Sequence, residues 1–470
     1  MKYLELNAET VVCNEDDFLQ SYGLRAFNLL KLFKVAKDFG FVVPTSVLIS
    51  SELSRDVCRF GQSLNFTGVP ARFSLSADDR IDAYCKYLSE NHPALLEIAR
   101  LVDKGNAPII RGTLCSEGYN DLSFAGVCHS YIPKLNIDFD TNVYNGIAKV
   151  LSSTFSPYAN YYFNIHDIPV KKNDVGIIMM EMISKPLFHV TAYVYKSEIR
   201  IKYFFTPETG TLYAGGGEVI VTEKDEEVIL EKEFGEFATI WQKTIDVLRK
   251  IPEVIENADC PIDVEFLIAQ KHNSYELNIV QARKLSPVHL NNYLCSQNFP
   301  MSNIAKQVLI PESFIYHSVG RFKGRLCTGG FKSRWMKNDL PNIFMVKHDS
   351  GEGLFRFLEE LPKDFCGVGL IVTHPEMRTH DHLQYSVYED PRFSFVLHVE
   401  DSAVSNLKDG MILKVTSNGK RVSIEEQDEI VIDGIHINFI HSLDEIDESL
   451  VSAVFLVGFM GEEIIAGRNE

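Results

Sequence analysis

The stretch Ile-Ile-Arg-Gly-Thr-Leu-Cys-Ser-Glu-Gly-Tyr-Asn-Asp-Leu-Ser-Phe-Ala-Gly, residues 109–126, decides how the rest of the sequence is interpreted. Residues 108–110 predict a short apolar strand, after which Arg111 enters a loop of small and polar residues. The loop closes on Ser-Phe-Ala-Gly at residues 123–126. Such a loop can lie over phosphate groups, because glycine-rich turns expose backbone amides to an anion. An ordinary strand and loop with a surface arginine is the alternative.

A second motif predicts a hairpin with polar groups gathered on one side. It reads Pro-Ile-Asp-Val-Glu-Phe-Leu-Ile at residues 261–268 and Tyr-Glu-Leu-Asn-Ile-Val-Gln-Ala-Arg at residues 275–283. Strand alternation places Asp263 with Glu265, and Gln281 with Arg283, on one face of each strand. Oxygen ligands of this kind hold Mg²⁺, and an arginine beside them can contact the phosphates that the cation bridges. A half-buried amphipathic hairpin is the alternative interpretation.

Three further segments carry weaker signals. Residues 26–39 have helical periodicity, follow Arg25 and precede Gly40, a typical C-cap. Residues 175–183 form an apolar run typical of a buried strand, which ends near Glu181 and Ile183. Gly-Gly-Gly precedes Glu218, in a segment expected to form a hairpin.

Together these segments resemble the ATP-binding domain of the phosphoenolpyruvate synthase and pyruvate phosphate dikinase family. That family reads roughly Arg-Ser-Ser-Ala-Thr-Ala-Glu-Asp, a spacer, and Ser-Phe-Ala-Gly. Arg111, Glu117 and residues 123–126 stand in the same register. The family's Asp-Ile-Glu and Gln-Ala-Arg-Pro pair is similar to the hairpin above, with Lys284 in place of the proline. The resemblance implies an α/β (α+β) ATP-grasp domain.

The resemblance also implies roles for individual residues. Arg111 and Arg283 would act in catalysis, and Glu265 and Gln281 would bind Mg²⁺. The family's phosphate-binding lysine is replaced by Arg25, and its Ser-Gly-Val-x-Phe-Thr segment is absent from residues 188–193. The residues expected to bind ATP are Arg25, Arg111, Glu117, Glu181, Ile183, Glu218, Gln281 and Arg283.

The second half of the chain resembles the family's smaller swivelling β/α phosphohistidine domain. A glycine-flanked strand at residues 319–326 would open it, and Thr379-His380 stands where the family has Ser-His. A neutral imidazole can attack a phosphoryl group and carry it. His380 is the candidate carrier, with His374 and His382 as competitors, because both family glycines are missing. Polar histidines on a nonreactive loop are the alternative.

The motifs and the resemblance together predict four segments along the chain. They are an ATP-grasp domain over residues 1–290, a linker over 291–314, a swivelling domain over 315–425 and a C-terminal extension over 426–470. The alternation after residue 429 predicts two strands around a helix. Nothing in the chain resembles the barrel that binds phosphoenolpyruvate or pyruvate in the full-length enzymes.

Composition excludes several classes of protein. The 470 residues carry a formal net charge of −18 without a long basic run, which argues against nucleic acid as a partner. An acidic protein that binds a nucleotide must therefore concentrate positive charge locally. The longest late apolar run, residues 453–460, is far below the roughly 20 residues of a membrane span. Nine cysteines without Cys-x-x-Cys, and no signal peptide, favour the cytoplasm.

The resulting hypothesis is a dikinase-like phosphotransferase that uses ATP and Mg²⁺. His380 would pass the phosphoryl group to a small-molecule acceptor, bound by this chain or by a partner protein. Either AMP or ADP is compatible with the motifs as product. Two other classes remain open: a degenerate ATP-binding partner or regulator, and an ATP-grasp ligase that activates a carboxylate.

Overall fold

The computed structural model describes most of the first 284 residues and the strands of the remainder. The described residues are 2–63, 77–102, 106–115, 124, 127–168, 174–183, 186–196, 198–205, 215–222, 234–255, 261–271, 274–284, 309–310, 319–328, 341–347, 354, 357–358, 360–362, 365, 367–374, 387, 390–418, 422–427, 429–432, 435–439, 454–459 and 462–467. The chain divides into two compact units, residues 1–290 (unit 1) and 291–470 (unit 2). Both contain sheets, and unit 1 also contains long helices, so the predicted α/β class is confirmed.

The first sheet of unit 1 has the strand order β1-β2-β5-β3-β4. Its strands are β1 (Tyr3–Leu6), β2 (Ser46–Ile49), β3 (Ile109–Leu114), β4 (Ser130–Tyr131) and β5 (Val175–Met180). The short strand expected to end before Arg111 continues to Leu114, because β3 pairs with β5 along its whole length. Arg111 therefore lies within a strand. On its other side, β3 pairs with the two residues of β4.

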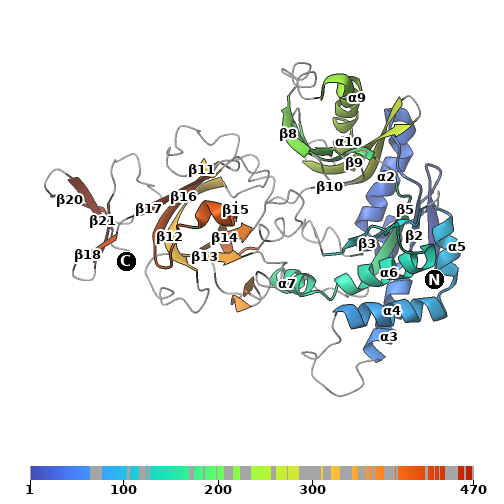
Figure 1. Cartoon of the computed structure of the whole chain (residues 1–470), viewed down its shortest axis with the longest axis horizontal. Coiled ribbons are helices and arrows are strands. Elements are labelled where there is room, and N and C mark those ends of the chain that lie inside the picture. The colour runs from blue at the N-terminus through green and yellow to red at the C-terminus, as the bar shows by residue number, and fades with distance from the viewer. Residues whose placement is uncertain are drawn as a thin grey trace. The chain divides into compact units, whose positions relative to one another are not determined.

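Helices cover this sheet and connect its strands (Figure 1). They are α1 (Glu15–Tyr22), α2 (Leu24–Phe39), α3 (Ser51–Ser63), α4 (Ala77–Asn91), α5 (Ala94–Arg100), α6 (Phe139–Ser153) and α7 (Pro157–Ile165). Helix α2 confirms the helix predicted over residues 26–39, and Gly40 ends it in the left-handed conformation. Because α2 packs against both β3 and a strand of the second sheet, it joins the two halves of the unit.

The second sheet has the order β10-β9-β6-β7-β8. Its strands are β6 (Pro186–Tyr195), β7 (Glu198–Phe205), β8 (Gly215–Val221), β9 (Ile262–Lys271) and β10 (Ser274–Lys284). The three glycines before Glu218 lie in β8, paired with β7, and do not form a turn. The predicted hairpin is confirmed as β9 and β10.

One face of the second sheet is apolar and packs against helices. Alternate residues of β9, from Ile262 to Ile268, join a core with Trp241 and its neighbours on α9 (Ala238–Leu248) and α10 (Ile251–Ile255). Helices α9 and α10 are separated by residues 249–250, and Pro252 is the second residue of α10. A proline lacks the amide that a continuous helix requires.

The opposite face of this sheet is polar, and a β-bulge in β10 decides which residues reach it. The pairing passes from Ile279, opposite Phe266, to Gln281, opposite Glu265, and skips Val280. A bulge inserts one extra residue and so reverses the alternation beyond it. Gln281 and Arg283 therefore share a face with the two carboxylates of β9.

Unit 2 contains two sheets. The larger has the order β11-β17-β16-β12-β13-β14-β15. Its strands are β11 (Leu309–Ile310), β12 (Val319–Cys327), β13 (Asn342–Lys347), β14 (Val368–His374), β15 (Phe393–Glu400), β16 (Ile412–Asn418) and β17 (Val422–Gln427). Strands β12 to β15 run parallel. Residues 354, 357, 358 and 360 are helical.

The C-terminal extension differs from expectation. It forms a four-stranded sheet of β18 (Glu429–Ile432), β19 (Ile435–Phe439), β20 (Val454–Phe459) and β21 (Glu462–Gly467). Two strands around a helix were predicted. Strands β18 and β19 form one hairpin, and β20 and β21 form another. Because the turns are short, the alternation of each hairpin resembles that of a single strand. No helix is present among the described residues of the extension.

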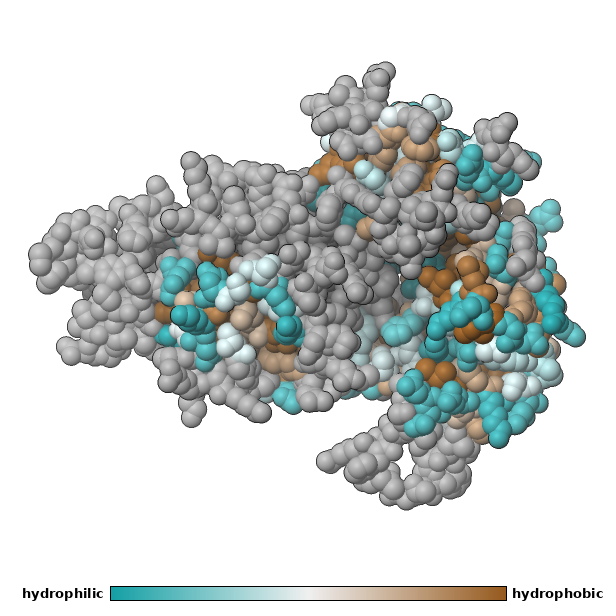
Figure 2. Space-filling view, viewed as in Figure 1, coloured by the Kyte–Doolittle hydropathy of each residue, from teal (hydrophilic) through white to brown (hydrophobic). Residues whose placement is uncertain are grey.

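The described surface is mixed in character. Figure 2 shows mainly hydrophilic residues over the helices α3 to α6, with hydrophobic residues between them. Within the described part of the chain, no helix combines the length and the apolar character needed to cross a membrane.

Candidate functional site

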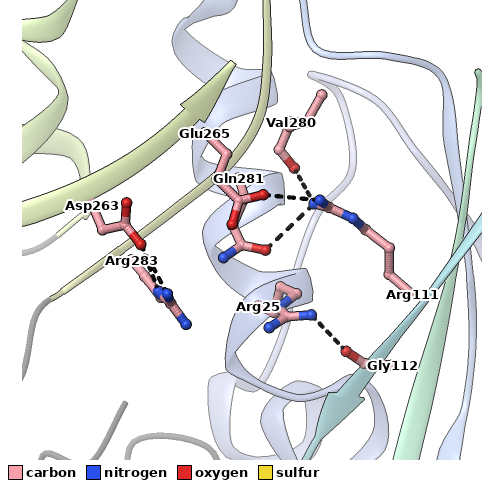
Figure 3. A network of polar contacts seen from close by, with 8 residues as sticks. All are labelled: Arg25, Arg111, Gly112, Asp263, Glu265, Val280, Gln281 and Arg283. Atoms are coloured by element: carbon pink, nitrogen blue, oxygen red, sulfur yellow. Dashed lines mark hydrogen bonds and ion pairs between the residues drawn. The ribbon is translucent and has the colours of Figure 1, made fainter. Parts of the chain in front are cut away.

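Arg111 is the residue around which the polar side chains of unit 1 gather (Figure 3). It extends from β3 of the first sheet toward β9 and β10 of the second. Its Nη2 donates to Glu265 Oε2 at 3.0 Å, and its Nη1 donates to Gln281 Oε1 at 3.3 Å. Both side chains of the ion pair are largely buried, with 14% and 23% of their surface exposed. One guanidinium thus joins the two sheets.

The bulge in β10 supplies the third acceptor. Arg111 Nη1 also donates to the carbonyl oxygen of Val280 at 3.1 Å. Val280 is the residue that the pairing of β10 with β9 skips. The Val280 carbonyl therefore accepts a hydrogen bond from a side chain. The bulge thus orients both Gln281 and the Val280 carbonyl toward Arg111.

A second ion pair lies beside the first, within the hairpin. Arg283 binds Asp263 Oδ2 through Nε at 3.0 Å and through Nη2 at 2.9 Å. The side chain of Asp263 is only 2% exposed. Its other oxygen, Oδ1, is buried and accepts no hydrogen bond from any residue that the structure describes. A buried oxygen without a donor is costly, so this atom is suited to a ligand or a water molecule.

Arg25 approaches the site from the first turn of α2. Its Nη1 donates to the carbonyl oxygen of Gly112 at 2.9 Å, immediately after Arg111 in β3. Gly23 fixes this approach, because its φ of +81° is a conformation that side chains rarely adopt. A Cβ at Gly23 would meet Thr113 Oγ1, and the Leu114 carbonyl oxygen at 2.8 Å. The glycine therefore allows α2 to begin directly against β3.

The electrostatics indicate that the charged groups act on one another. Burial lowers the pKa of Arg111, as do the neighbouring charges of Arg25 and Arg283, while Glu265 opposes the shift. Burial likewise raises the pKa of Asp263 above its usual range, and Arg283 opposes it.

Lys202 is a cation of the site that sequence reasoning missed. Its charge also acts to lower the pKa of Asp263, and it is only 5% exposed. It lies on β7 opposite Thr191, which in turn lies opposite Glu265. The alternation of charged and apolar residues in β7 could have indicated it, but only with the order of the strands known.

Among the side chains that the structure describes at this site, positive charges outnumber negative ones. Arg25, Arg111, Arg283 and Lys202 are cationic, whereas Asp263 and Glu265 are the carboxylates described beside them. Four positive charges against two negative ones favour an anion with several charges. The local concentration of positive charge expected for a nucleotide site on an acidic protein is present here.

Glu181 and Ile183, both expected to bind ATP, lie at the connection between the two sheets. Residues 181–183 follow β5, and β6 begins at Pro186. The amide of Glu181 donates to the Thr45 carbonyl oxygen at 2.8 Å, and Thr45 donates to Glu181 Oε2 at 3.3 Å. The amide of Glu181 is thus already engaged by Thr45, directly before β2 of the first sheet. Ile183 is half-buried.

The oxygen groups of the hairpin fit Mg²⁺. Glu265 Oε2 and Gln281 Oε1 already converge on one cationic group, the guanidinium of Arg111. The buried Oδ1 of Asp263 adds a further oxygen nearby. Hard oxygen ligands of this type are those that Mg²⁺ prefers, and it commonly uses only one or two carboxylates beside phosphates and water. Among the described residues, no group of three His, Cys, Asp or Glu side chains could hold a metal alone.

Several predicted site residues lie outside the described residues. Glu117, the loop closure at residues 123 and 125–126, and His380 belong to this group. Glu218 lies in β8 opposite Lys202, but its side chain is not described. Phe124 is described alone: it is buried, has a φ of +51°, and its amide donates to the hydroxyl of Tyr162 at 3.2 Å. This contact holds Phe124 against α7.

Comparisons with known proteins give distant likenesses. No protein-family model matches the sequence, and no curated protein matches it either. The macrocyclase MdnC bound with precursor peptide MdnA, from Microcystis aeruginosa MRC, is similar over 55% of this chain and 51% of its own, with 7% identity and a TM-score of 0.23. An L-amino acid ligase from Bacillus licheniformis is similar over 48% and 47%, with 11% identity and a TM-score of 0.19. The chain thus spans about half the length of these structures, and at such TM-scores neither likeness carries an argument.

Proposed function

We propose that unit 1 is an ATP-grasp domain that binds ATP with Mg²⁺ between its two sheets, and that the chain is an ATP-dependent phosphotransferase. One observation carries the proposal. Three arginines and Lys202 are brought from α2, β3, β7 and β10 to the two carboxylates of β9, so that an excess of positive charge lies beside oxygen ligands.

The order of residues along the polar face supports the same proposal. Near residues 181–183, this face of β9 carries Ala269 and Leu267, which are apolar. The same face carries Glu265 four residues from Ala269, which is about 13 Å along a strand, and then Asp263. Glu181 lies close enough to Lys271, at the apolar end of β9, for its charge to act on that lysine. The pKa of Lys271 is raised mainly by its hydrogen bond with Glu276 and to a smaller extent by Glu181. An extended nucleotide fits this order, with its base at the apolar end and its phosphates at the charged end.

The residues of the site would act by positioning and by charge stabilisation. Arg111 and Arg283 would bind phosphate oxygens through paired hydrogen bonds, and Arg25 and Lys202 would add charge from either side. Glu265 and Gln281 would hold Mg²⁺, which when bound neutralises charge on the phosphate oxygens. The acceptor's lone pair would form a bond to phosphorus while the bond to the bridging oxygen breaks, and that oxygen would leave with the electron pair.

Calorimetry with a nonhydrolysable ATP analogue and Mg²⁺ tests this assignment. We expect Arg283→Met to weaken binding about 10- to 100-fold, since hydrogen bonds to charged groups contribute roughly 1.5–3 kcal/mol. Arg100→Met is the matched control, because it removes an equal charge from an exposed pair with Asp140 on another part of unit 1. Unchanged affinity in Arg283→Met would contradict the assignment. Turnover of ATP is monitored by phosphorus NMR. Binding of the analogue without any turnover of ATP would favour a degenerate partner or regulator.

The finer proposal is that His380 carries the phosphoryl group to the acceptor. It rests on the sequence resemblance. A ring nitrogen would form the bond to phosphorus, the bond to the nucleotide oxygen would break, and the imidazole would lose its proton to water. With Mg²⁺ and ATP we expect an acid-labile phosphoprotein in wild type that His380→Ala abolishes. His374→Ala and His382→Ala serve as controls. Full labelling of His380→Ala would contradict the carrier role.

A further inference from the structure

The two oxygens assigned to the metal are the same two that hold Arg111. Glu265 Oε2 accepts from Nη2 of Arg111 at 3.0 Å, and Gln281 Oε1 lies 3.3 Å from Nη1. The carbonyl of Val280 fixes the same nitrogen at 3.1 Å. A dication at these oxygens would stand within a few ångströms of the guanidinium, in a site where Arg111 is 14% exposed and screening is weak. The two cations therefore compete for one ligand set.

We infer that Arg111 makes the binding of metal and nucleotide conditional on each other. Its guanidinium occupies the oxygen pair of Glu265 and Gln281 as an internal cation. It leaves them only when phosphates offer other acceptors. This inference rests on the proposed function and adds a specificity role to Arg111: the site selects the metal–nucleotide complex against the free metal.

The position of the other arginines supports a role particular to Arg111. Arg25 donates to a backbone carbonyl, that of Gly112, and Arg283 is held by Asp263. Neither of these contacts involves Glu265 or Gln281. Removing Arg25 or Arg111 subtracts the same charge from the neighbourhood, but Arg111 is the residue seen to donate to both oxygens of the pair. The two variants therefore separate competition for ligands from a general change in potential.

Binding of Mn²⁺ alone, measured by calorimetry and by the loss of its free electron paramagnetic resonance signal, tests the inference. We expect Arg111→Met to bind Mn²⁺ at least about tenfold more tightly than wild type, because a charge-assisted contact no longer opposes the metal. Arg25→Met should change the affinity less than about threefold. The double variant Arg111→Met with Glu265→Gln should lose the gain, since the cycle isolates the pair.

Equal affinity for Mn²⁺ in Arg111→Met and Arg25→Met would overturn the inference, as would a gain that persists in the double variant. If Arg111→Met does not fold, judged by circular dichroism, Arg111→Lys replaces it, because lysine keeps the charge but lacks the fork that reaches both oxygens. For Arg111→Lys we expect a smaller gain in Mn²⁺ affinity, and no gain at all would contradict the inference. The inference and the proposed function fail in distinguishable ways. A gain in Mn²⁺ affinity without nucleotide binding refutes the function and leaves only the competition between Arg111 and the metal. Nucleotide binding without the gain refutes the inference and leaves the function.

Discussion

Single cysteines of unit 1 illustrate how burial sets reactivity residue by residue. Burial raises the pKa of Cys58 from 9.0 to about 11, although a hydrogen bond with Tyr84 opposes the shift. Burial also raises the pKa of Cys85 to about 11, and its Sγ lies 3.0 Å from Asn145 Oδ1. Only the thiolate reacts with alkylating reagents, so both residues should be unreactive at neutral pH.

We therefore expect iodoacetamide at pH 8 to label Cys13, which is exposed, well before Cys58 and Cys85. A rise of two pKa units lowers the thiolate fraction about a hundredfold. Labelling of Cys58 and Cys85 should accelerate as the pH approaches 11, because the thiolate then forms. Peptide mass mapping over time measures the rates. If Cys58 is labelled as fast as Cys13 in the folded protein, the prediction is wrong. Protein unfolded in urea gives the labelling rate of each cysteine without burial.

At the scale of elements, the start of α2 against β3 positions two arginines together. Gly23 permits this contact, and we expect Gly23→Ala to cost about 3 kcal/mol or more in free energy of unfolding. The cost combines an unfavourable backbone conformation with a collision against β3. Gly235 is a suitable control: its φ is +49° and nothing lies within 4 Å of a Cβ there.

Denaturant unfolding of both variants measures this difference. Gly235→Ala should lose only about 1–2 kcal/mol, the cost of a left-handed alanine. Nucleotide affinity should fall in Gly23→Ala and remain unchanged in Gly235→Ala, because only the former displaces Arg25. Equal losses of stability in the two variants would show that the contact between α2 and β3 is not tight.

The elements also show what a sequence can and cannot predict. That Asp263 shares a face with Glu265, and Gln281 with Arg283, could be predicted because alternation depends only on local geometry. That both pairs lie on the same side of the sheet depends on the bulge. The full length of β3 could not, since Arg-Gly-Thr lacks strand character and is extended by its pairing with β5. The bulge at Val280 and the place of Lys202 depend on neighbouring strands distant in sequence, so neither appears in a local pattern.

At the scale of the whole molecule, charge is distributed unevenly. The chain has a formal net charge of −18, yet four cations meet two carboxylates in the candidate site. An acidic surface repels nucleotides at distances up to a Debye length, about 8 Å at physiological salt. Attraction is therefore confined to the site itself. This arrangement favours selective binding over loose binding of polyanions elsewhere on the surface.

The extra residue in β10 has a consequence for how this chain can be redesigned or compared with others. Removing Val280 would restore a regular ladder and turn Gln281 and Arg283 toward the apolar side, where Ala282 now lies. A one-residue deletion at this point would thus exchange the inner and outer faces of the strand's end while leaving the motif's letters intact. Any relative that keeps Gln-Ala-Arg but lacks the additional position cannot present these groups in the same way.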